Sequence, residues 1–434
     1  MVVGLLGNES SDSNRFTLVT PKSENDVRLQ VTLVCRLEVK LMKDNTTLVF
    51  TGDIGFDKYM KDEWQDKQLL SNDVLAFLHS GDHVIANVEG ALVKTDTSAS
   101  SGTAQLVHAM DPRCVQVLDQ MHADIWNLCN NHIMDAGDTG VEATLQEAER
   151  HHASTIGAGM NLKQAKQPLY LDEAGGIGIF ACGFRRGCKP AGDHKAGCLL
   201  WNEMDLIAEN IRKIKKKCRW CIMVVHGGEE FTSLPSPYVR DRYLTYLQLG
   251  ADIIVSHHPH VPMNYETVGN KIIFYSLGNF IFDTDYQRAQ RNTDLGILVR
   301  LKLNEETYNW DACGIQIDRH SEHVKKTELP LIFTDVQQDQ YELLEPLAAK
   351  QMIGAYKQRQ IYLDPETWKN ADEEQWEKHF MDPKRSGRVP GEALDFIIMS
   401  GIADQEKGQW RKSHLEGVKE YILKELETYE EGKK

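Results

Sequence analysis

The feature that most constrains this fold is a series of short apolar runs, several of which end in a side chain that can bind a metal. Each run has about four to seven apolar residues bounded by glycine, aspartate or asparagine, a pattern typical of strands buried on both faces of a sheet. The runs lie in the segments TLVFTGD, HVIANVEG, ADIWNLCNNH, GGIGIFACGF, CIMVVHGG, ADIIVSHHPH, KIIFYSLGNF and LGILVRLKL. These strands predict the sheets of an α/β protein.

Helical stretches separate these runs. Residues 138–152 and 236–250 carry apolar side chains at spacings of three and four and end at or near a helix-stopping signal. The alternation of buried strands and helices predicts a layered α/β domain over residues 46–320.

Different patterns flank this domain. Residues 1–45 form an N-terminal extension in which apolar side chains alternate from Val27 to Leu41, which predicts a long amphipathic strand. Residues 321–434 contain periodic, Gln-, Glu- and Lys-rich segments at 336–360 and 404–430. We expect a mainly helical C-terminal appendage that packs on the main domain.

The composition of the chain limits the classes of partner it could bind and the cellular compartment expected for it. The formal net charge of -15 disfavours binding to nucleic acid and to anionic membranes. No segment approaches the ~20 consecutive apolar residues of a membrane span, and the first residues do not resemble an export signal. Nine cysteines are an odd number, so reduced thiols and a cytoplasmic location are expected. Cys218 and Cys221 have the spacing of half a zinc knuckle, but no second such pair follows.

Side chains that can bind metal recur where a predicted strand gives way to a loop. Five segments supply them, with the residues Asp53, Glu89, Asn131, His132, His226, Glu230, His257, His258 and His260. In layered α/β folds, ligands bind in the crevice at the carboxyl ends of the strands. Mixed nitrogen and oxygen donors suit Zn, Mn or Fe. Two such ions side by side would favour hydrolysis of a phosphoester.

An arginine lies at the same predicted rim. Arg185 follows the apolar run GIGIFACGF, and a guanidinium there could bind an anionic group of a substrate. The alternative is an ordinary ion pair at the surface.

The order of these motifs resembles a known family. The strings TGDIGFD, NVEG, CNNHIMDAGDTG, TIGAG, HGGEEF, GADIIVSHHPHV and KIIFYSLGNFIFD look like the bacterial poly-γ-glutamate capsule biosynthesis family CapA, over about residues 46–300. The resemblance implies a fold related to the calcineurin-like metallophosphatases. The expected fold class is therefore α/β, a layered metallophosphatase-like β-sandwich flanked by helices, with a C-terminal helical appendage.

The resemblance also implies roles for individual residues. One or two divalent metal ions (Mn, Fe or Zn) would be bound by Asp53, Glu89, Asn131, His226, His258 and His260. Asp53 would bind the first metal, Asn131 would bind the second, and Glu89 would hold or bridge them. His132 would act as a general acid or charge stabiliser at the leaving group, with Asp135 orienting its ring.

Further residues are candidates for contact with the substrate. Glu230 and His257 lie within the same motifs as the metal ligands, and Glu230 could instead support a ligand. Asn279, in the SLGNF motif, would brace its loop or touch the substrate. These residues and Arg185 complete the predicted site.

Two positions depart from the family pattern. Gly55 stands where metallophosphatases carry a histidine ligand, which allows a site with one metal. Gly227 stands where the family has a tryptophan, which removes a bulky side chain from the pocket wall.

Three functions remain open at this point. The first is a metal-dependent hydrolase that cleaves a phosphoester by attack of metal-bound hydroxide. The second is a poly-γ-glutamate capsule biosynthesis factor that acts on or binds an anionic polymer. The third is a binding scaffold without catalysis. The substrate is an anionic small molecule or polymer in the first two cases, and the sequence leaves the oligomeric state open.

Overall fold

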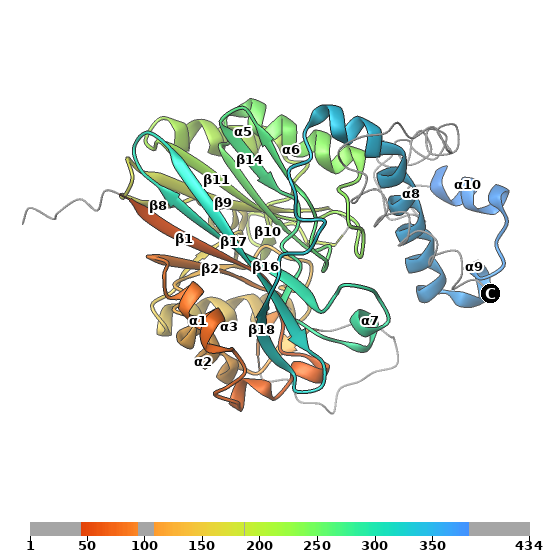
Figure 1. Cartoon of the computed structure of the whole chain (residues 1–434), viewed down its shortest axis with the longest axis horizontal. Coiled ribbons are helices and arrows are strands. Elements are labelled where there is room, and N and C mark those ends of the chain that lie inside the picture. Colours follow the sequence, from red (N-terminus) through yellow and green to blue (C-terminus); the bar gives the residue numbers. More distant parts are fainter. Residues whose placement is uncertain (1–44, 94–107, 186, 382–434) are drawn as a thin grey trace, which may run out of the picture. The chain divides into compact units, whose positions relative to one another are not determined.

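The computed structural model describes residues 45–93, 108–185 and 187–381. The predicted strand at 27–41 and the periodic segment at 404–430 lie outside the described residues. Within the described part, the chain forms two main sheets with helices on their outer faces (Figure 1). The predicted layered α/β fold is therefore confirmed.

The first sheet has eight strands, in the order β18-β17-β16-β1-β2-β5-β6, with β15 also paired to β1. Strands β1, β2, β5, β6 and β15 run parallel to one another, and β16, β17 and β18 continue the sheet from β1 as antiparallel strands. Their bounds are β1 (Thr46–Ile54), β2 (His83–Val88), β5 (Ile125–Asn127), β6 (Ser154–Ile156), β15 (Asn279–Ile281), β16 (Leu295–Leu303), β17 (Tyr308–Asp318) and β18 (His323–Thr327).

The second sheet has six strands in the order β13-β14-β12-β11-β9-β8. Its four central strands are parallel, and β8 and β13 are antiparallel edges. The bounds are β8 (Leu169–Leu171), β9 (Ile177–Gly183), β11 (Trp220–His226), β12 (Ile253–His257), β13 (Tyr265–Val268) and β14 (Lys271–Phe274). Two short pairs join β3 (Ala91–Leu92) to β4 (Ala109–Met110) and β7 (Ala158–Gly159) to β10 (Gly197–Cys198).

Helices cover the outer faces of the two sheets. Figure 1 shows α5 and α6 against the six-stranded sheet and α1, α2 and α3 against the eight-stranded sheet. Their bounds are α1 (Asn72–Leu78), α2 (Val115–Gln120), α3 (Gly137–Arg150), α4 (Leu162–Ala165), α5 (Met204–Lys215), α6 (Pro237–Leu249) and α7 (Asp285–Arg288). Short 3-10 turns span Lys58–Met60, Glu63–Gln65 and Pro112–Cys114.

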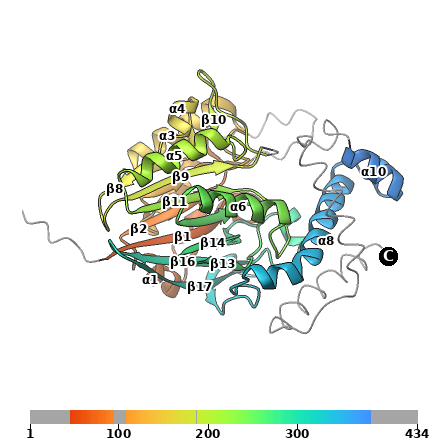
Figure 2. The same ribbon diagram turned by 90° about the horizontal axis from the view of Figure 1, so that it is seen from above.

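Up to residue 381, where the described part of the chain ends, three more helices follow the sheets. They are α8 (Gln338–Leu363), α9 (Pro365–Trp368) and α10 (Glu373–Met381), and Figure 2 shows α8 beside α6. No helix that the structure describes is long and apolar enough to cross a membrane.

The position of the central strands in the core explains why their sequences are continuous apolar runs. Every residue of β9 and β11 is buried, because each strand has a neighbour on both sides and a packed layer on both faces. Ile179, Val224 and Val255 belong to one apolar cluster that extends through both sheets. This rigid packing fixes the strand ends from which the functional side chains project.

A buried ion pair near the second sheet gives a test of stability. Arg240 of α6 donates two hydrogen bonds to Glu266 of β13, at 2.9 and 2.6 Å, and Tyr275 donates a third at 2.7 Å. Arg240→Ala would leave the Glu266 carboxylate buried without its cation, so we expect the free energy of unfolding to fall by about 3–5 kcal/mol. Urea denaturation measures this change.

An exposed pair provides the control. Lys213 contacts Glu209 on the surface of α5, so Lys213→Ala should change the free energy of unfolding by less than about 1 kcal/mol. Equal effects of the two substitutions would contradict the importance of burial.

Candidate metal centre

The candidate site lies where the parallel strands of the two sheets end. Asp53 is the penultimate residue of β1, and Glu89 directly follows β2. On the other sheet, His226 ends β11 and His257 ends β12. Parallel strands present their carboxyl ends at the same edge of a sheet, so residues far apart in sequence are brought together here.

Two groups of side chains could each hold a metal ion. One consists of Glu89, His226 and His258, and the other of Asp53, Glu89 and His260. Within each group, one ligand atom from each residue lies within 4.8 Å of the others. Glu89 belongs to both groups, so its carboxylate could contribute a ligand to either or both of two adjacent ions.

Asn131 adjoins the first group. Its Oδ1 lies 2.7 Å from Nε2 of His226, and the same Nε2 lies 3.6 Å from Oε1 of Glu89. All six residues for which the sequence predicts metal binding are thus gathered at one place. Their roles as ligands stay a prediction.

The chemistry of this donor set fits a cation. Both carboxylate oxygens of Glu89 are buried and have no hydrogen-bond partner among the described residues. An uncompensated buried carboxylate costs several kcal/mol. A divalent cation would supply the missing partner, so the residues present suit a bound metal.

The two acidic residues respond differently to this environment. Burial, and secondarily the charge of Asp53, raises the pKa of Glu89 well above its usual range. Burial also tends to raise the pKa of Asp53, but the imidazoles of His257 and His260 outweigh it and hold that pKa well below its usual range. Asn87 adds a hydrogen bond of 2.7 Å to Asp53. Asp53 is therefore the acid of the site that ionises more readily.

The pKa values of the histidines also shift in opposite directions. Burial lowers the pKa of both His226 and His258 well below the usual range, which keeps them neutral, as metal ligands must be. Burial also acts to lower the pKa of His260, but the charges of Glu89 and Asp53 outweigh it and raise the pKa to about 9. In the absence of a cation, His260 takes up the positive charge that the acids require.

The loop that carries the histidines is held in an unusual backbone conformation. His258 has φ 97° and His260 has φ 59°, and Phe231 in the facing loop has φ 63°. Non-glycine residues rarely adopt such angles, and they persist where the surroundings fix them, often at functional sites. The Phe231 N–H donates to the Pro259 carbonyl at 2.8 Å, so the two strained loops hold each other.

Asn279 supports His260. Its Oδ1 lies 2.9 Å from Nδ1 of His260, and its amide nitrogen donates to Gln287 Oε1 at 3.0 Å and to the Thr293 carbonyl at 2.8 Å. These two donated bonds fix the orientation of the amide. The sequence left two alternatives for Asn279, bracing its loop or touching the substrate; its bonds to Gln287, Thr293 and His260 are those of a bracing residue.

His132 and Asp135 form the pair that the resemblance implied. Nδ1 of His132 lies 2.8 Å from Oδ2 of Asp135. Burial lowers the pKa of His132, and the hydrogen bond with Asp135 opposes this shift. The carboxylate fixes the ring and leaves Nε2 as the nitrogen available to a substrate.

A second pair beside it was missed by sequence reasoning. His108 pairs with Asp57, and its ring meets that of His132 edge to face at 4.0 Å between centroids. The backbone N–H of His108 also donates to Asp135 at 2.9 Å. Asp57 lies in the TGDIGFD motif, which is the one signal that could have drawn attention to it.

The space beside Gly55 explains the absent histidine. A Cβ atom at this position would lie 2.4 Å from Cδ2 of Phe282. The ring of Phe282 stacks on His260, with centroids 4.9 Å apart. An aromatic side chain therefore fills the volume that a ligand at position 55 would need.

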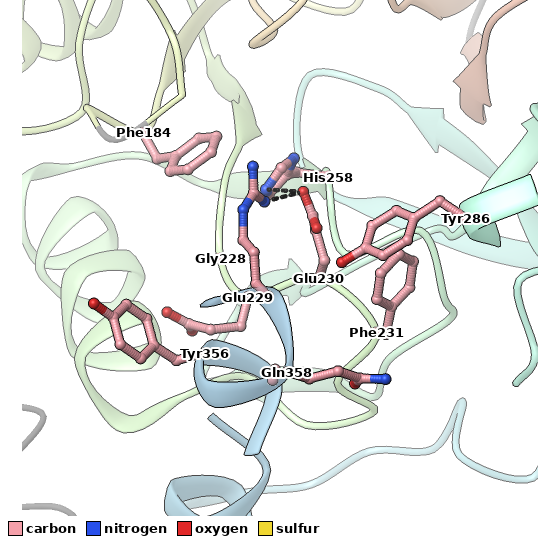
Figure 3. Close-up of a pocket in the computed structure, with 11 residues that line it drawn as sticks. Phe184, Gly228, Glu229, Glu230, Phe231, His258, Tyr286, Tyr356 and Gln358 are labelled. Atoms are coloured by element: carbon pink, nitrogen blue, oxygen red, sulfur yellow. Dashed lines mark hydrogen bonds and ion pairs between the residues drawn. The ribbon is translucent and has the colours of Figure 1, made fainter. Parts of the chain in front are cut away.

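The predicted substrate-contacting residues are spread over different environments. His257 is buried, with Nδ1 3.3 Å from Oδ1 of Asp53, a candidate metal ligand. Arg185 is exposed, just beyond β9. Glu230 lines a pocket over His258, shown in Figure 3, and forms an ion pair with Arg359 of α8. Sequence reasoning did not identify Arg359.

Comparison with known proteins identifies the family of this chain. The family model described as "Bacterial capsule synthesis protein PGA_cap" matches residues 47–284, more than half of the chain. The chain is 29% identical over 258 residues to "PGA biosynthesis protein CapA" of Bacillus subtilis (strain 168), covering 58% of this chain and 68% of that protein. It is 29% identical over 257 residues to "Capsule biosynthesis protein CapA" of Bacillus anthracis, covering 57% and 62%.

Solved structures show weaker likeness. A hypothetical protein from Thermus thermophilus aligns with a TM-score of 0.40 and 14% identity, over 65% of this chain and all of that one. A 5'-nucleotidase from Candida albicans aligns with a TM-score of 0.38 and 12% identity, over 64% and 52%. Scores at this level do not by themselves define a common fold.

The layered α/β fold and the family match define a protein of the metallophosphatase-like superfamily. More specifically, the chain belongs to the bacterial capsule synthesis family PGA_cap.

Proposed function

We propose that this protein is a metal-dependent hydrolase that cleaves a phosphoester. The observation that carries the proposal is Glu89, a fully buried carboxylate without a hydrogen-bond partner among the described residues, shared by two groups of potential ligands. A pair of divalent cations bound there would activate a water molecule as nucleophile and neutralise the charge on the phosphoryl oxygens.

The residues of the chain would bind the ions, protonate the leaving group and position one another. Asp53 and His260 would hold one ion, Asn131, His226 and His258 the other, and Glu89 would contact both. The protonated imidazolium of His132, which the Asp135 carboxylate favours, would donate the proton on Nε2 to the leaving oxygen. Asp135 would keep the ring in the orientation that presents Nε2. Asn279 and Asn87 would position His260 and Asp53 through the hydrogen bonds described above.

The relatives support a second function. Both Bacillus proteins are named for the biosynthesis of a capsule or of PGA. A role of this chain in handling poly-γ-glutamate, an anionic polymer, would use the same site to bind or cut the polymer. A purely structural scaffold is less favoured, because it gives no reason for burying the Glu89 carboxylate without a hydrogen-bond partner among the described residues.

The test is the metal content of the full-length protein purified without chelator, measured by elemental analysis. We expect two equivalents of Mn, Fe or Zn in the wild type. His260→Ala removes a ligand from one group only, so it should lower the content to about one equivalent. One equivalent in the wild type would indicate a single-metal site, and none after incubation with each ion would exclude the catalytic proposal.

A substrate comparison separates the two functions. The metal-loaded protein should release inorganic phosphate from aryl phosphomonoesters or diesters if it is a phosphoesterase. Shortening of γ-linked glutamate polymers without phosphate release from any ester would favour the polymer function instead.

A further inference from the structure

Helix α8 lies outside the residues that match the family model, yet it contributes to the pocket over His258. The pocket is lined by Phe184, Gly228, Glu229, Glu230, Phe231, His258, Tyr286, Ala355, Tyr356, Gln358 and Arg359. The last four belong to α8. The family match ends at residue 284, so this wall of the pocket is formed by residues that the family model does not cover.

The position of α8 is set by contacts earlier in the helix. Tyr341 donates to the Pro235 carbonyl at 2.6 Å, and the amide of Gln351 donates to Ser233 Oγ at 2.9 Å while accepting from the Leu234 N–H at 3.2 Å. Leu234 also packs with apolar side chains of α8 in a small core of its own. The loop that follows the HGGEEF motif is thereby fastened to α8, and the helix holds Arg359 at the pocket.

Arg359 is the permanent cation of this pocket. Its Nη1 pairs with Oε1 of Glu230, and the same oxygen lies 3.8 Å from Nε2 of His258. Only one carboxylate oxygen thus separates the guanidinium from a candidate metal ligand. No partner of Nε or Nη2 of Arg359 is found among residues 45–93, 108–185 and 187–381, so two of its nitrogens remain available to a ligand.

The charges around the pocket make Arg359 a candidate to bind an anionic substrate. The carboxylate of Glu229 is engaged by hydrogen bonds from Ser236 and Tyr238, both 2.6 Å long. The protein as a whole carries a net charge of -15, which repels anions at long range. An anionic substrate therefore needs a local cation besides the metals, and guanidinium binds phosphate and carboxylate groups through two parallel hydrogen bonds.

We propose that Arg359 binds a second anionic group of the substrate, next to the group held at the metals, and that Glu230 occupies Arg359 until this anion arrives. The inference rests on the proposed function in assuming an anionic substrate at the metal centre. The second group would be a phosphate or a carboxylate. The aromatic rings of Phe184, Phe231, Tyr286 and Tyr356 (Figure 3) would flank the part of the substrate between the two groups.

The test measures binding by calorimetry to the full-length, metal-loaded protein. The probes are orthophosphate, with one anionic centre, and pyrophosphate and a γ-linked glutamate trimer, with more than one. In Arg359→Gln, we expect the dissociation constant for pyrophosphate or for the trimer to rise about 10-fold or more, while that for orthophosphate changes much less. The multivalent probe that is affected identifies the second group as phosphate or carboxylate.

Two further variants make the result specific. Lys369→Gln removes the same charge from an exposed position shortly after α8 and should leave all three constants unchanged. Glu230→Gln removes the competing carboxylate and should tighten binding of the affected probe. If Glu230→Gln weakens binding as much as Arg359→Gln, the pair is only a structural tether and the inference is wrong.

The remaining outcomes separate this inference from the proposed function. Two equivalents of metal in Arg359→Gln with unchanged binding of both multivalent probes would overturn the role of Arg359 and leave the metal centre intact. Absence of measurable binding of either multivalent probe to the wild type would also overturn it. Weaker binding in Arg359→Gln without any ester hydrolysis by the wild type would support Arg359 and contradict the phosphoesterase.

Discussion

Glu89→Gln should remove metal from both groups of ligands at once. The substitution keeps the size of the side chain but replaces the charged oxygen shared by the Glu89/His226/His258 and Asp53/Glu89/His260 groups. We expect metal affinity to fall by more than the ~10–100-fold typical of residues that only support a ligand. Turnover should fall ~10³-fold or more, since the metals contribute several kcal/mol to the transition state.

The same variant should have the opposite effect on the stability of the cation-free protein. Burial and the charge of Asp53 raise the pKa of Glu89, so the folded state binds a proton more tightly than the unfolded chain. The free energy of unfolding then falls as the pH rises from the ordinary glutamate pKa of about 4.3 toward the raised value. Glutamine does not ionise, so cation-free Glu89→Gln should be more stable than cation-free wild type at pH 8.

Elemental analysis checks the predicted loss of metal. Urea denaturation in the presence of a chelator checks the predicted stability of the cation-free protein. Glu142→Gln, an exposed change on α3, is the matched control and should leave metal content and stability unchanged. Retention of two equivalents of metal by Glu89→Gln would show that Glu89 does not bridge the site. Loss of metal together with loss of stability would indicate simple misfolding.

The fold could be predicted from the sequence because its strands are buried on both faces. Runs such as those of β9, β11 and β12 are buried along their whole length, so each appears in the sequence as a continuous, mainly apolar segment, and β11 and β12 each end at a histidine. The proximity of Asp53 and Glu89 follows from the same pattern, since β1 and β2 are parallel neighbours whose ends lie at a common edge. His260 follows β12 of the other sheet, so its approach to these two residues depends on how the two sheets pack, which strand periodicity does not contain.

The remaining features depend on contacts that no local pattern contains. Arg359 is 129 positions from Glu230, and the periodicity of a helix gives its apolar face but not where that face docks. His108 lies 51 positions from Asp57, and each residue alone is an ordinary polar side chain. The glycine at position 55 is visible in the sequence, whereas the ring of Phe282 that fills its space is not.

His132→Ala should reduce turnover ~10²-fold or more and leave the metal content nearly unchanged. His132 contacts Asp135 and the ring of His108, and it belongs to neither group of candidate metal ligands. A positioned general acid contributes about 10²- to 10⁴-fold to rate. Elemental analysis of the variant distinguishes the roles, because a parallel loss of metal would make His132 a ligand.

The dependence on the leaving group provides the sharper test of His132. A general acid matters most when the departing oxygen is strongly basic, so His132→Ala should slow the hydrolysis of phenyl phosphate more than that of p-nitrophenyl phosphate. Asp135→Asn keeps the imidazole but weakens its orientation, so its effect should have the same dependence and a smaller size. Equal losses for the two esters would contradict proton donation and leave His132 as a residue that stabilises charge on the phosphoryl group.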